Sequence, residues 1–290
     1  MSAMKNDDKA SFLFRATTRE AFVIKILSEL LSVANVKLAT FRIDAEGIHL
    51  SQPDVNNHQL INFDLTRENF TPFRVTRPLN FQISSTNLHR MLKSIKKKDT
   101  LTLFIKDNDD CQLGICVQTP DENNRTNTNL RITYVQPKVY PEPLGYPDPT
   151  IVTNKEFQKM KNLHNIDKKM TVSCNRPGLI TFYCNNQAVY EREVVLGQHY
   201  EDEDAHDDSF EPYSQTFRTS YITNLTKCAN QSGNVQIFIN HDLPIKIKMR
   251  AGTLGDLTVL IKSDERIALE QKLEAEKKKA ASMGEETFEE

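Results

Sequence analysis

The sequence contains no run of apolar residues that approaches the roughly 18–20 needed to cross a bilayer. Its first eleven residues are polar and include no apolar core of a secretory signal. We therefore expect no membrane partner and no signal peptide, and we expect residues 1–11 to form a flexible N-terminus. At 290 residues the chain is long for one domain and has room for two.

Cysteine and histidine are present without the spacing of a functional site. The five cysteines include no C-x-x-C pair, and the seven histidines are scattered. An odd number of cysteines predicts free thiols in a reducing compartment, and no metal site or cofactor is expected. Clustered carboxylates, a Cys/His pair and a Gly-rich phosphate loop are also lacking. A DNA-directed hydrolase or other enzyme is therefore disfavoured.

Charge of neither sign dominates the composition, since the formal net charge is −2. The distribution is uneven. Acidic residues concentrate in 201–208 and 285–290, which most simply predicts solvated segments. A near-neutral total is compatible with a basic working surface elsewhere.

Residues 84–105 predict a basic amphipathic helix followed by a strand. Arg90, Lys93 and Lys97 fall on one helical face at i, i+3 and i+7. A solvated helix face would explain any one of these cations, but a row of them suits a polyanion. The opposite face carries apolar residues at the 3–4 spacing, namely Leu88, Met91, Leu92 and Ile95.

The same pattern returns later in the chain at a nearly constant offset. The equivalent residues are Phe22 and Phe157, Gly47 and Gly178, Leu88 and Ile222, Lys93 and Lys227, and Leu101 and Val235. All five offsets lie within four residues of one another, which indicates a duplicated domain. Five prolines crowd the stretch between the copies, which predicts an extended linker. We expect domains over 12–136 and 151–263, an interdomain connector over 137–150 and a charged C-terminal tail over 264–290 that is at most partly helical and otherwise frayed or disordered.

The expected elements alternate strands with few helices. Thr18 is the expected N-cap of the first helix, and polar residues 120–128 predict a loop. The expected strands cover 11–16, 38–43, 47–52, 58–66, 79–84, 101–106, 112–118 and 130–135, and the second copy is expected to begin with a helix over 155–163 and to contain another over 217–229.

Four stretches are similar to the DNA sliding clamps of the proliferating cell nuclear antigen type. They are FRIDAEGIHLSQPD (Phe41–Asp54), the basic helix and its strands (Phe81–Ile105), EPLGYPDP (Glu142–Pro149) and HDLPIKIKMRAGTLGDLTVLI (His241–Ile261). The resemblance covers about residues 12–262. It implies an α+β fold of two tandem clamp domains, with antiparallel sheets outside and helices lining a channel. Three subunits would form a homotrimeric ring around double-stranded DNA.

The resemblance also implies the roles of individual residues. Non-specific DNA binding needs cations that neutralise phosphates, and the matching DNA-binding channel positions are Lys25, Arg90, Lys93, Lys97, Lys155, Lys159, Lys161 and Lys227. The partner-peptide pocket of the family, which takes an aromatic-tipped peptide beneath the connector, matches Pro53, Leu144, Tyr146, Pro147, Pro244 and Leu260. The edge strands that close the ring match 130–135 and 188–196, with Leu130, Ile132, Tyr134, Val189, Glu191 and Val194 as subunit-interface residues.

Departures from the family pattern indicate a divergent, and in one interpretation viral, member. Pro53 stands where the family usually has Met, and Leu260 where it often has Tyr. Arg176 replaces the lysine that cellular clamps modify with ubiquitin, so that switch is expected to be absent.

The function implied is a non-enzymatic processivity factor for a DNA polymerase, placed on DNA by a clamp loader and serving replication and repair proteins. It would act in the nucleus or in a viral replication compartment. The alternatives are a subunit of a checkpoint-type heterotrimer and a viral polymerase accessory factor that is monomeric or dimeric.

Overall fold

The computed structural model describes residues 11–121, 124–186, 189–197 and 211–285. Expectations for residues 1–10, for the acidic segment 201–208 and for residues 286–290 fall outside these ranges. The first half of the chain contains β1 (Phe12–Thr18), α1 (Ala21–Val33), β2 (Leu38–Ile43), β3 (Gly47–Pro53), β4 (Gln59–Thr66), the 3-10 helix η2 (Arg67–Asn69), β5 (Phe73–Val75), β6 (Leu79–Ser84), α2 (Ser85–Leu92), β7 (Thr100–Lys106), β8 (Asp109–Gln118), β9 (Arg125–Arg131) and β10 (Thr133–Tyr134).

The second half repeats this order and adds a long helix. It contains β11 (Thr150–Thr153), α3 (Asn154–Phe157), the 3-10 helix η3 (Gln158–Asn165), β12 (Lys169–Arg176), β13 (Leu179–Asn186), β14 (Tyr190–Gly197), β15 (Tyr213–Arg218), α4 (Thr219–Thr223), α5 (Thr226–Ala229), β16 (Asn234–Phe238), β17 (Ile245–Ala251), β18 (Gly255–Ile261) and α6 (Asp264–Glu285).

Sheet topology confirms the duplication. The order β1-β7-β8-β9 in the first repeat matches β11-β16-β17-β18 in the second, and β6-β2-β3-β4 matches β15-β12-β13-β14. Antiparallel pairing of β4 with β18 joins the two repeats into one nine-stranded sheet, with the order β10-β6-β2-β3-β4-β18-β17-β16-β11. A five-stranded sheet and a four-stranded sheet hold the remaining strands. The α+β fold of two tandem domains is therefore as predicted.

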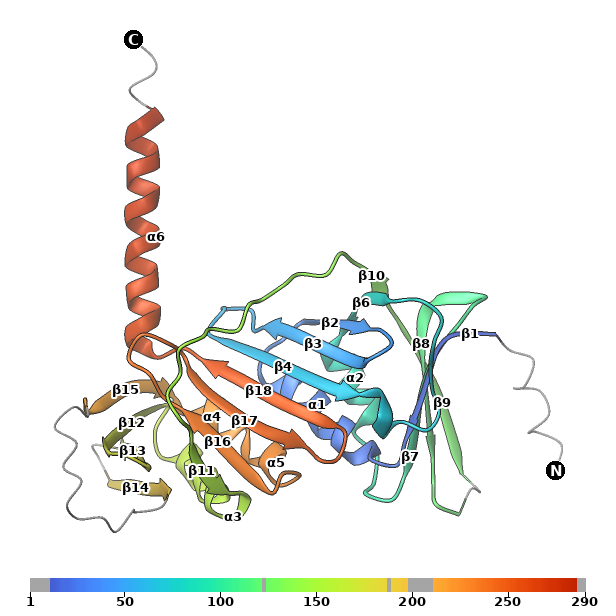
Figure 1. Ribbon diagram of the computed structural model, residues 1–290, viewed down its shortest axis with the longest axis horizontal. Coiled ribbons are helices and arrows are strands. Elements are labelled where there is room, and N and C mark those ends of the chain that lie inside the picture. Colours follow the sequence, from blue (N-terminus) through green and yellow to red (C-terminus); the bar gives the residue numbers. More distant parts are fainter. Residues whose placement is uncertain (1–10, 122–123, 187–188, 198–210, 286–290) are drawn as a thin grey trace.

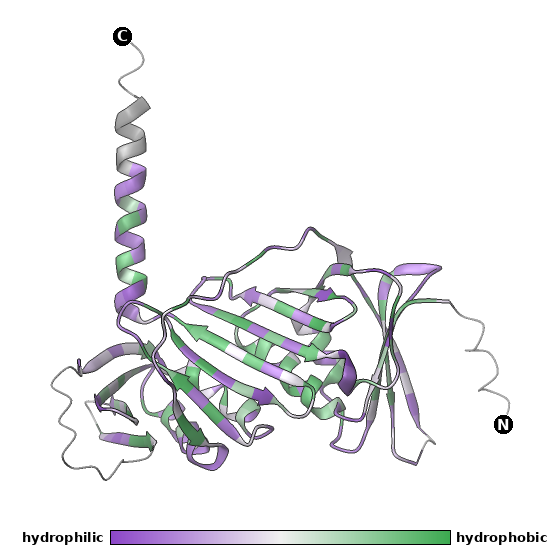
Figure 2. Ribbon diagram, viewed as in Figure 1, coloured by the Kyte–Doolittle hydropathy of each residue, from purple (hydrophilic) through white to green (hydrophobic). Residues whose placement is uncertain are grey.

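The short helices lie against one face of the nine-stranded sheet, and the two smaller sheets stand at its ends (Figure 1). The core fills the space between helices and sheets, where alternate strand residues and the apolar face of α1 are buried. Figure 2 shows this alternation of apolar and polar residues along the strands.

The N-terminus of α1 differs from the expectation. The helix begins at Ala21, with Glu20 at the N-cap. Thr18 Oγ1 instead accepts the backbone N–H of Glu20 at 3.0 Å, so it stabilises the turn that leads into the helix. The apolar residues Val23, Ile26, Leu27, Leu30 and Leu31 of this helix are buried, whereas Phe22 is half-buried.

The first helix of the second repeat is mostly a 3-10 helix, which corrects the expected α-helix. One α-helical turn with a Thr153–Glu156 capping box leads into η3. Phe157, Met160 and Leu163 are fully buried. A strict spacing of three places them on one line in a 3-10 helix, because that helix has three residues per turn. In an α-helix the same spacing would drift around the axis.

The basic helices predicted over the segments that begin at residues 84 and 217 are shorter than predicted. Helix α2 ends at Leu92, with Lys93 at its C-cap, so Lys97 lies in the following turn and not on the helical stripe. The segment expected as one helix over 217–229 is divided into α4 and α5, and Phe217 belongs to β15.

The strand expected over 130–135 is two strands in two different sheets. β9 pairs with β8, whereas β10 pairs with β6. The chain changes sheet at Ile132, whose side chain is 3% exposed and whose N–H donates to the carbonyl of Cys111 at 2.9 Å. β9 also begins at Arg125, within the segment expected as a loop.

The C-terminal tail is helical over Asp264–Glu285, so it contains more helix than the partly helical, frayed tail that we expected. Its first turns are fixed by polar contacts rather than by an apolar face. The Glu265 carboxylate accepts the N–H of Thr216 on β15, Asp264 pairs with Lys169 at 2.7 Å, and Glu270 pairs with Lys262 at 2.6 Å. Beyond these contacts the helix projects away from the body (Figure 1).

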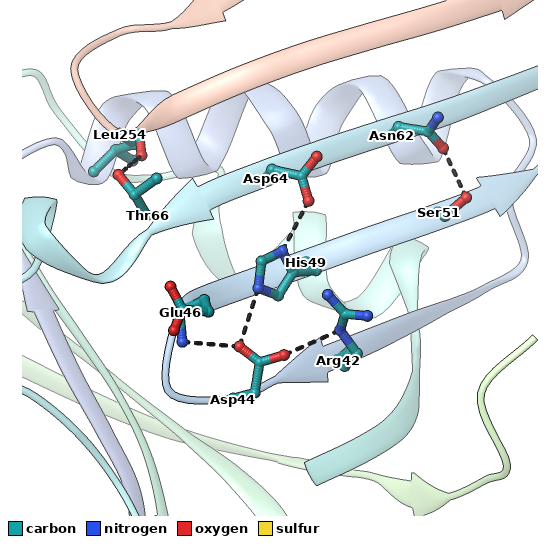
Figure 3. A network of polar contacts seen from close by, with 9 residues as sticks. All are labelled: Arg42, Asp44, Glu46, His49, Ser51, Asn62, Asp64, Thr66 and Leu254. Carbon is teal, nitrogen blue, oxygen red and sulfur yellow. Dashed lines mark hydrogen bonds and ion pairs between the residues drawn. The ribbon is translucent and has the colours of Figure 1, made fainter. Parts of the chain in front are cut away.

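A histidine held between two carboxylates joins β3 to its neighbours on the sheet surface (Figure 3). His49 Nδ1 lies 2.8 Å from an Asp64 oxygen and Nε2 lies 3.2 Å from Asp44, which also pairs with Arg42 at 3.2 Å. The hydrogen bond to Asp64 raises the pKa of His49, burial opposes this, and Asp44 adds to the rise.

We expect this network to make stability depend on pH. Because the folded-state pKa is raised, the stabilisation is fully present below the unfolded pKa of about 6.5 and is lost as pH rises through the folded value. The free energy of unfolding should fall by about 0.5–1 kcal/mol over that window, a small loss because Asp64 is exposed. Urea titrations of the wild type and of His49→Gln at several pH values check this. An equal pH slope in both proteins would contradict the assignment.

Candidate functional site

The predicted cations of the first basic segment are exposed, but they reach the surface from different local structures. Arg90 lies on α2, Lys93 caps its end, and Lys97 lies in the turn before β7. Lys96 and Lys98 in the same turn are also exposed and were not among the predicted residues. The signal that could have identified them is the run of three lysines directly before a strand.

This lysine turn has a fixed shape. Asp99 is buried, and its Oδ2 accepts the backbone N–H of Lys96 at 2.8 Å. The N–H of Ile95 donates to the carbonyl of Leu92 at 3.1 Å, and Ile95 is buried. The three lysine side chains are thus presented by an ordered backbone rather than by a loose loop.

The predicted cations of the second repeat are exposed on α3 and η3. Lys155 lies in the first turn, and Lys159 and Lys161 follow in the 3-10 segment. Lys155 is thus on the α-helical turn, and Lys159 and Lys161 lie on neighbouring sides of the 3-10 segment. These cations therefore form a group separate from the lysine turn.

Two of the predicted cations bind polar groups of the chain. Lys25 Nζ donates to the carbonyl of Ile95 at 2.9 Å and lies 5.2 Å from the Phe22 ring centroid. This ties α1 to the lysine turn while leaving the charge of Lys25 in place. The ammonium of Lys227, on α5, pairs with the carboxylate of Glu29, on α1.

The residues predicted as a peptide pocket range from exposed to buried. Leu144 in the connector is 90% exposed and Pro147 is exposed, whereas Pro53 is half-buried. Pro244 is buried. Leu260 is 3% exposed within β18, on the sheet face opposite the core residues Val259 and Ile261.

Tyr146 fixes the connector to the second repeat. Its hydroxyl donates to the carbonyl of Pro244 at 2.7 Å, and its ring lies edge-on to Phe238 with centroids 6.0 Å apart. The Lys246 ammonium lies 4.7 Å from the Phe238 centroid and 5.4 Å from that of Tyr146, and it pairs with Glu142. Burial raises the pKa of Tyr146 well above its usual range, so the hydroxyl remains a donor.

The predicted interface residues lie on several edges. Leu130 is half-buried on β9, whereas Tyr134 is on β10, where its hydroxyl donates to the carbonyl of Asp110 at 3.0 Å. Val189 and Glu191 are exposed at β14, while Val194 is buried. Residue 188, the start of the second expected edge strand, lies outside the described residues. β9 and β14 are the last strands of the two smaller sheets.

Within the described residues, no group of His, Cys, Asp and Glu side chains is arranged to hold a metal ion. None of the helices described there combines the length and apolar character needed to span a bilayer.

Comparison with known proteins assigns both repeats to one family. Residues 13–138 match the N-terminal domain model of proliferating cell nuclear antigen, and residues 148–263 match the C-terminal domain model. The chain is 24% identical to the proliferating cell nuclear antigen of Chaetomium thermophilum over 75% of this chain and 85% of the relative. It is 23% identical to that of Dictyostelium discoideum over 84% of this chain and 96% of the relative. The chain therefore belongs to the proliferating cell nuclear antigen family, as a divergent DNA sliding clamp with no enzymatic activity of its own.

Proposed function

We propose that three copies of this chain form a closed ring around double-stranded DNA and tether a DNA polymerase to its template. The observation that carries the proposal is an incomplete internal symmetry. In the chain, β4 of the first repeat pairs with β18 of the second. Their equivalents in the opposite repeats are β14 and β9, and both are terminal strands of their sheets. Pairing β9 of one copy with β14 of the next repeats the contact that already joins the two domains.

The internal repeat also specifies the register of that pairing. For the strands at this contact, equivalent positions of β4 and β14, and of β9 and β18, are 131 residues apart, as for Leu65 with Leu196 and Leu130 with Ile261. Because Ile61 faces Val259 in the β4–β18 pair, Arg192 should face Thr128 of the neighbouring copy.

Hydrogen-bond parity supports this register independently. In the β4–β18 pair, Thr66 donates to the carbonyl of Leu254, which makes alternate positions hydrogen-bonded. When the bonded positions of β18 are carried to β9 at the offset of 131 residues, they include Asn127 and Asn129. On the other side of β9, Ile132 is bonded to Cys111 of β8, so Asn127 and Asn129 direct their backbone groups away from β8. Both routes give the same outward-facing positions.

Charge complementarity favours a second copy of this chain over a different partner. In the proposed register, Asn129 faces Glu191 and Asn127 faces Glu193. Arg131 and Arg125 then lie diagonal to Glu191 and Glu193 on the same face, within reach for long side chains. All four charged side chains are exposed in the single chain. The self-closing trimer is thereby preferred to a checkpoint-type heterotrimer or to a monomeric accessory factor.

The exposed cations on the helix side would then line the channel. Arg90, Lys93 and the lysine turn come from the first repeat, and Lys155, Lys159 and Lys161 from the second. Contacts with phosphates alone carry no sequence information, which suits a protein that must move along DNA. The ring raises the polymerase's effective concentration at the primer end, in the nucleus or a viral replication compartment.

Cysteine cross-linking tests the ring directly. Thr128→Cys combined with Arg192→Cys should give, on oxidation, one covalent species with the mass of three chains, because these positions form a closely spaced non-hydrogen-bonded pair. The protein is loaded onto circular duplex DNA and then oxidised. The cross-linked ring should be retained on the circle and released when the DNA is linearised. The control pair Asn127→Cys with Arg192→Cys is out of register. Monomers alone, or equal retention on linear DNA, would refute the proposal.

We also propose that the connector surface around Leu144 binds the aromatic-tipped peptides of the polymerase and other partners, the clamp loader among them. Leu144 is 90% exposed, so Leu144→Ala should leave stability unchanged. It should lower the affinity for a synthetic peptide with two adjacent aromatic residues about fivefold or more, which is the cost typical of losing an interface anchor. Fluorescence anisotropy measures the affinity. Val139→Ala is the matched control, since Val139 is 86% exposed in the same connector. Equal losses in both variants would place the pocket elsewhere.

A further inference from the structure

An acidic side chain lies among the cations on the helix side of the molecule. Glu29 on α1 and Lys227 on α5 form an ion pair between residues 198 positions apart, and so between the two repeats. The Glu29 side chain is 24% exposed and that of Lys227 is 62% exposed. The carboxylate is therefore partly enclosed, whereas the ammonium remains accessible from solvent.

The pair lies at a groove of about 220 Å³ where the two repeats meet. Ile26, Leu30 and Val33 of α1 supply an apolar wall. Lys161 and His164 of η3 face it from the second repeat. Glu29 is thus the one carboxylate lining a groove that contains two lysines. In the absence of DNA, the Lys227 ammonium is therefore already paired with the Glu29 carboxylate.

We infer that Glu29 holds Lys227 as a strut between the two domains, and that this interrupts the row of phosphate-binding cations at the domain junction within each subunit. The inference rests on the proposed DNA-binding function. A phosphate that takes Lys227 must displace the carboxylate, which then lies unpaired beside the DNA backbone. Lys227 therefore contributes little to the free energy of DNA binding. The engagement of Lys25 differs, because the Ile95 carbonyl leaves its charge uncompensated.

The salt dependence of DNA binding distinguishes a strut from a phosphate contact. Each phosphate neutralised contributes about 0.9 to the slope of log affinity against log salt concentration. We would measure the anisotropy of a fluorescein-labelled linear duplex over a series of salt concentrations. Lys159→Gln should lower the slope magnitude by about 0.9. Lys227→Gln should leave it nearly unchanged, and Glu29→Gln should raise it by about 0.9 by releasing Lys227.

Two further variants complete the test. Glu274→Gln changes the net charge as Glu29→Gln does, but on the projecting part of α6, and should leave the slope unchanged. The exchange of Glu29→Lys with Lys227→Glu keeps the strut with its charges reversed, and should retain the wild-type slope and thermal midpoint. If Lys227→Gln lowered the slope as much as Lys159→Gln, and Glu29→Gln had no effect, the strut would be refuted. If wild-type protein showed no salt-dependent binding to the duplex, the proposed function itself would fail.

Discussion

Reversing three exposed cations, by Arg90→Glu, Lys93→Glu and Lys159→Glu together, is expected to abolish retention on circular duplex DNA. The three residues come from both repeats and are exposed, so the fold should survive. Each lost phosphate contact lowers affinity near 0.1 M salt by about eightfold, which gives a loss of about 500-fold for three contacts before repulsion by the new carboxylates is counted. The salt slope should fall by about 3. Stimulation of a polymerase on long templates should be lost in parallel.

The matched control for this triple variant is charge reversal on other surfaces. Arg67, Arg74 and Lys138 are exposed in η2, β5 and the connector, and none lies on the α-helices or in the lysine turn. Their reversal changes the net charge of the subunit equally, from −2 to −8, and should leave retention close to that of the wild type. Circular dichroism and thermal midpoints verify folding in both proteins. Equal loss of retention in the two triple variants would show that overall charge, rather than the helix side, governs DNA binding.

A proline at Asn129 is expected to dissociate the ring into monomers without unfolding the subunit. The backbone groups of Asn129 face away from β8, so proline removes an outward N–H while leaving the ladder within the sheet intact. Proline is tolerated in edge strands for this reason. At the β9–β14 contact it would remove one hydrogen bond and introduce a clash, at a cost of about 2–3 kcal/mol, or roughly 100-fold in dissociation constant per contact.

Sedimentation measures this outcome directly. Asn129→Ala keeps the N–H and should remain trimeric, which makes it the matched control. Retention on circular DNA should be lost with Asn129→Pro and kept with Asn129→Ala. A trimeric Asn129→Pro protein with wild-type retention would contradict the proposed pairing of β9 with β14.

Much of this architecture follows from short-range patterns. Apolar spacing identified Leu88, Leu92 and Ile95 as buried residues of the α2 segment, alternation identified most strands, and the recurrence of Gly47 as Gly178 marked the duplication. Gly47 is required because a Cβ there would lie 2.0 Å from the Leu65 carbonyl oxygen. This close approach between neighbouring strands cannot be inferred from the sequence around Gly47.

The errors arose where tertiary contacts overrode local preference. Periodicity alone could not show that a spacing of three at Phe157, Met160 and Leu163 produces a 3-10 helix. Alternation across Leu130 to Val135 could not show that the chain changes sheet at Ile132. The tail lacks an apolar face. Its first turn is fixed because Glu265 and Asp264 bind Thr216 and Lys169, which are far away in the sequence.

The sequence by itself determined the duplication, the family and the positions of the exposed cations, because these depend on residue type and spacing along the chain. Only the tertiary structure decided which of those charges remain available. Lys227 resembles Lys93 in the linear pattern, yet Glu29 lies beside it from the other repeat. The physical reason is that the field at an ammonium depends on the charges within a few ångströms of it, and folding places there residues that are 198 positions apart.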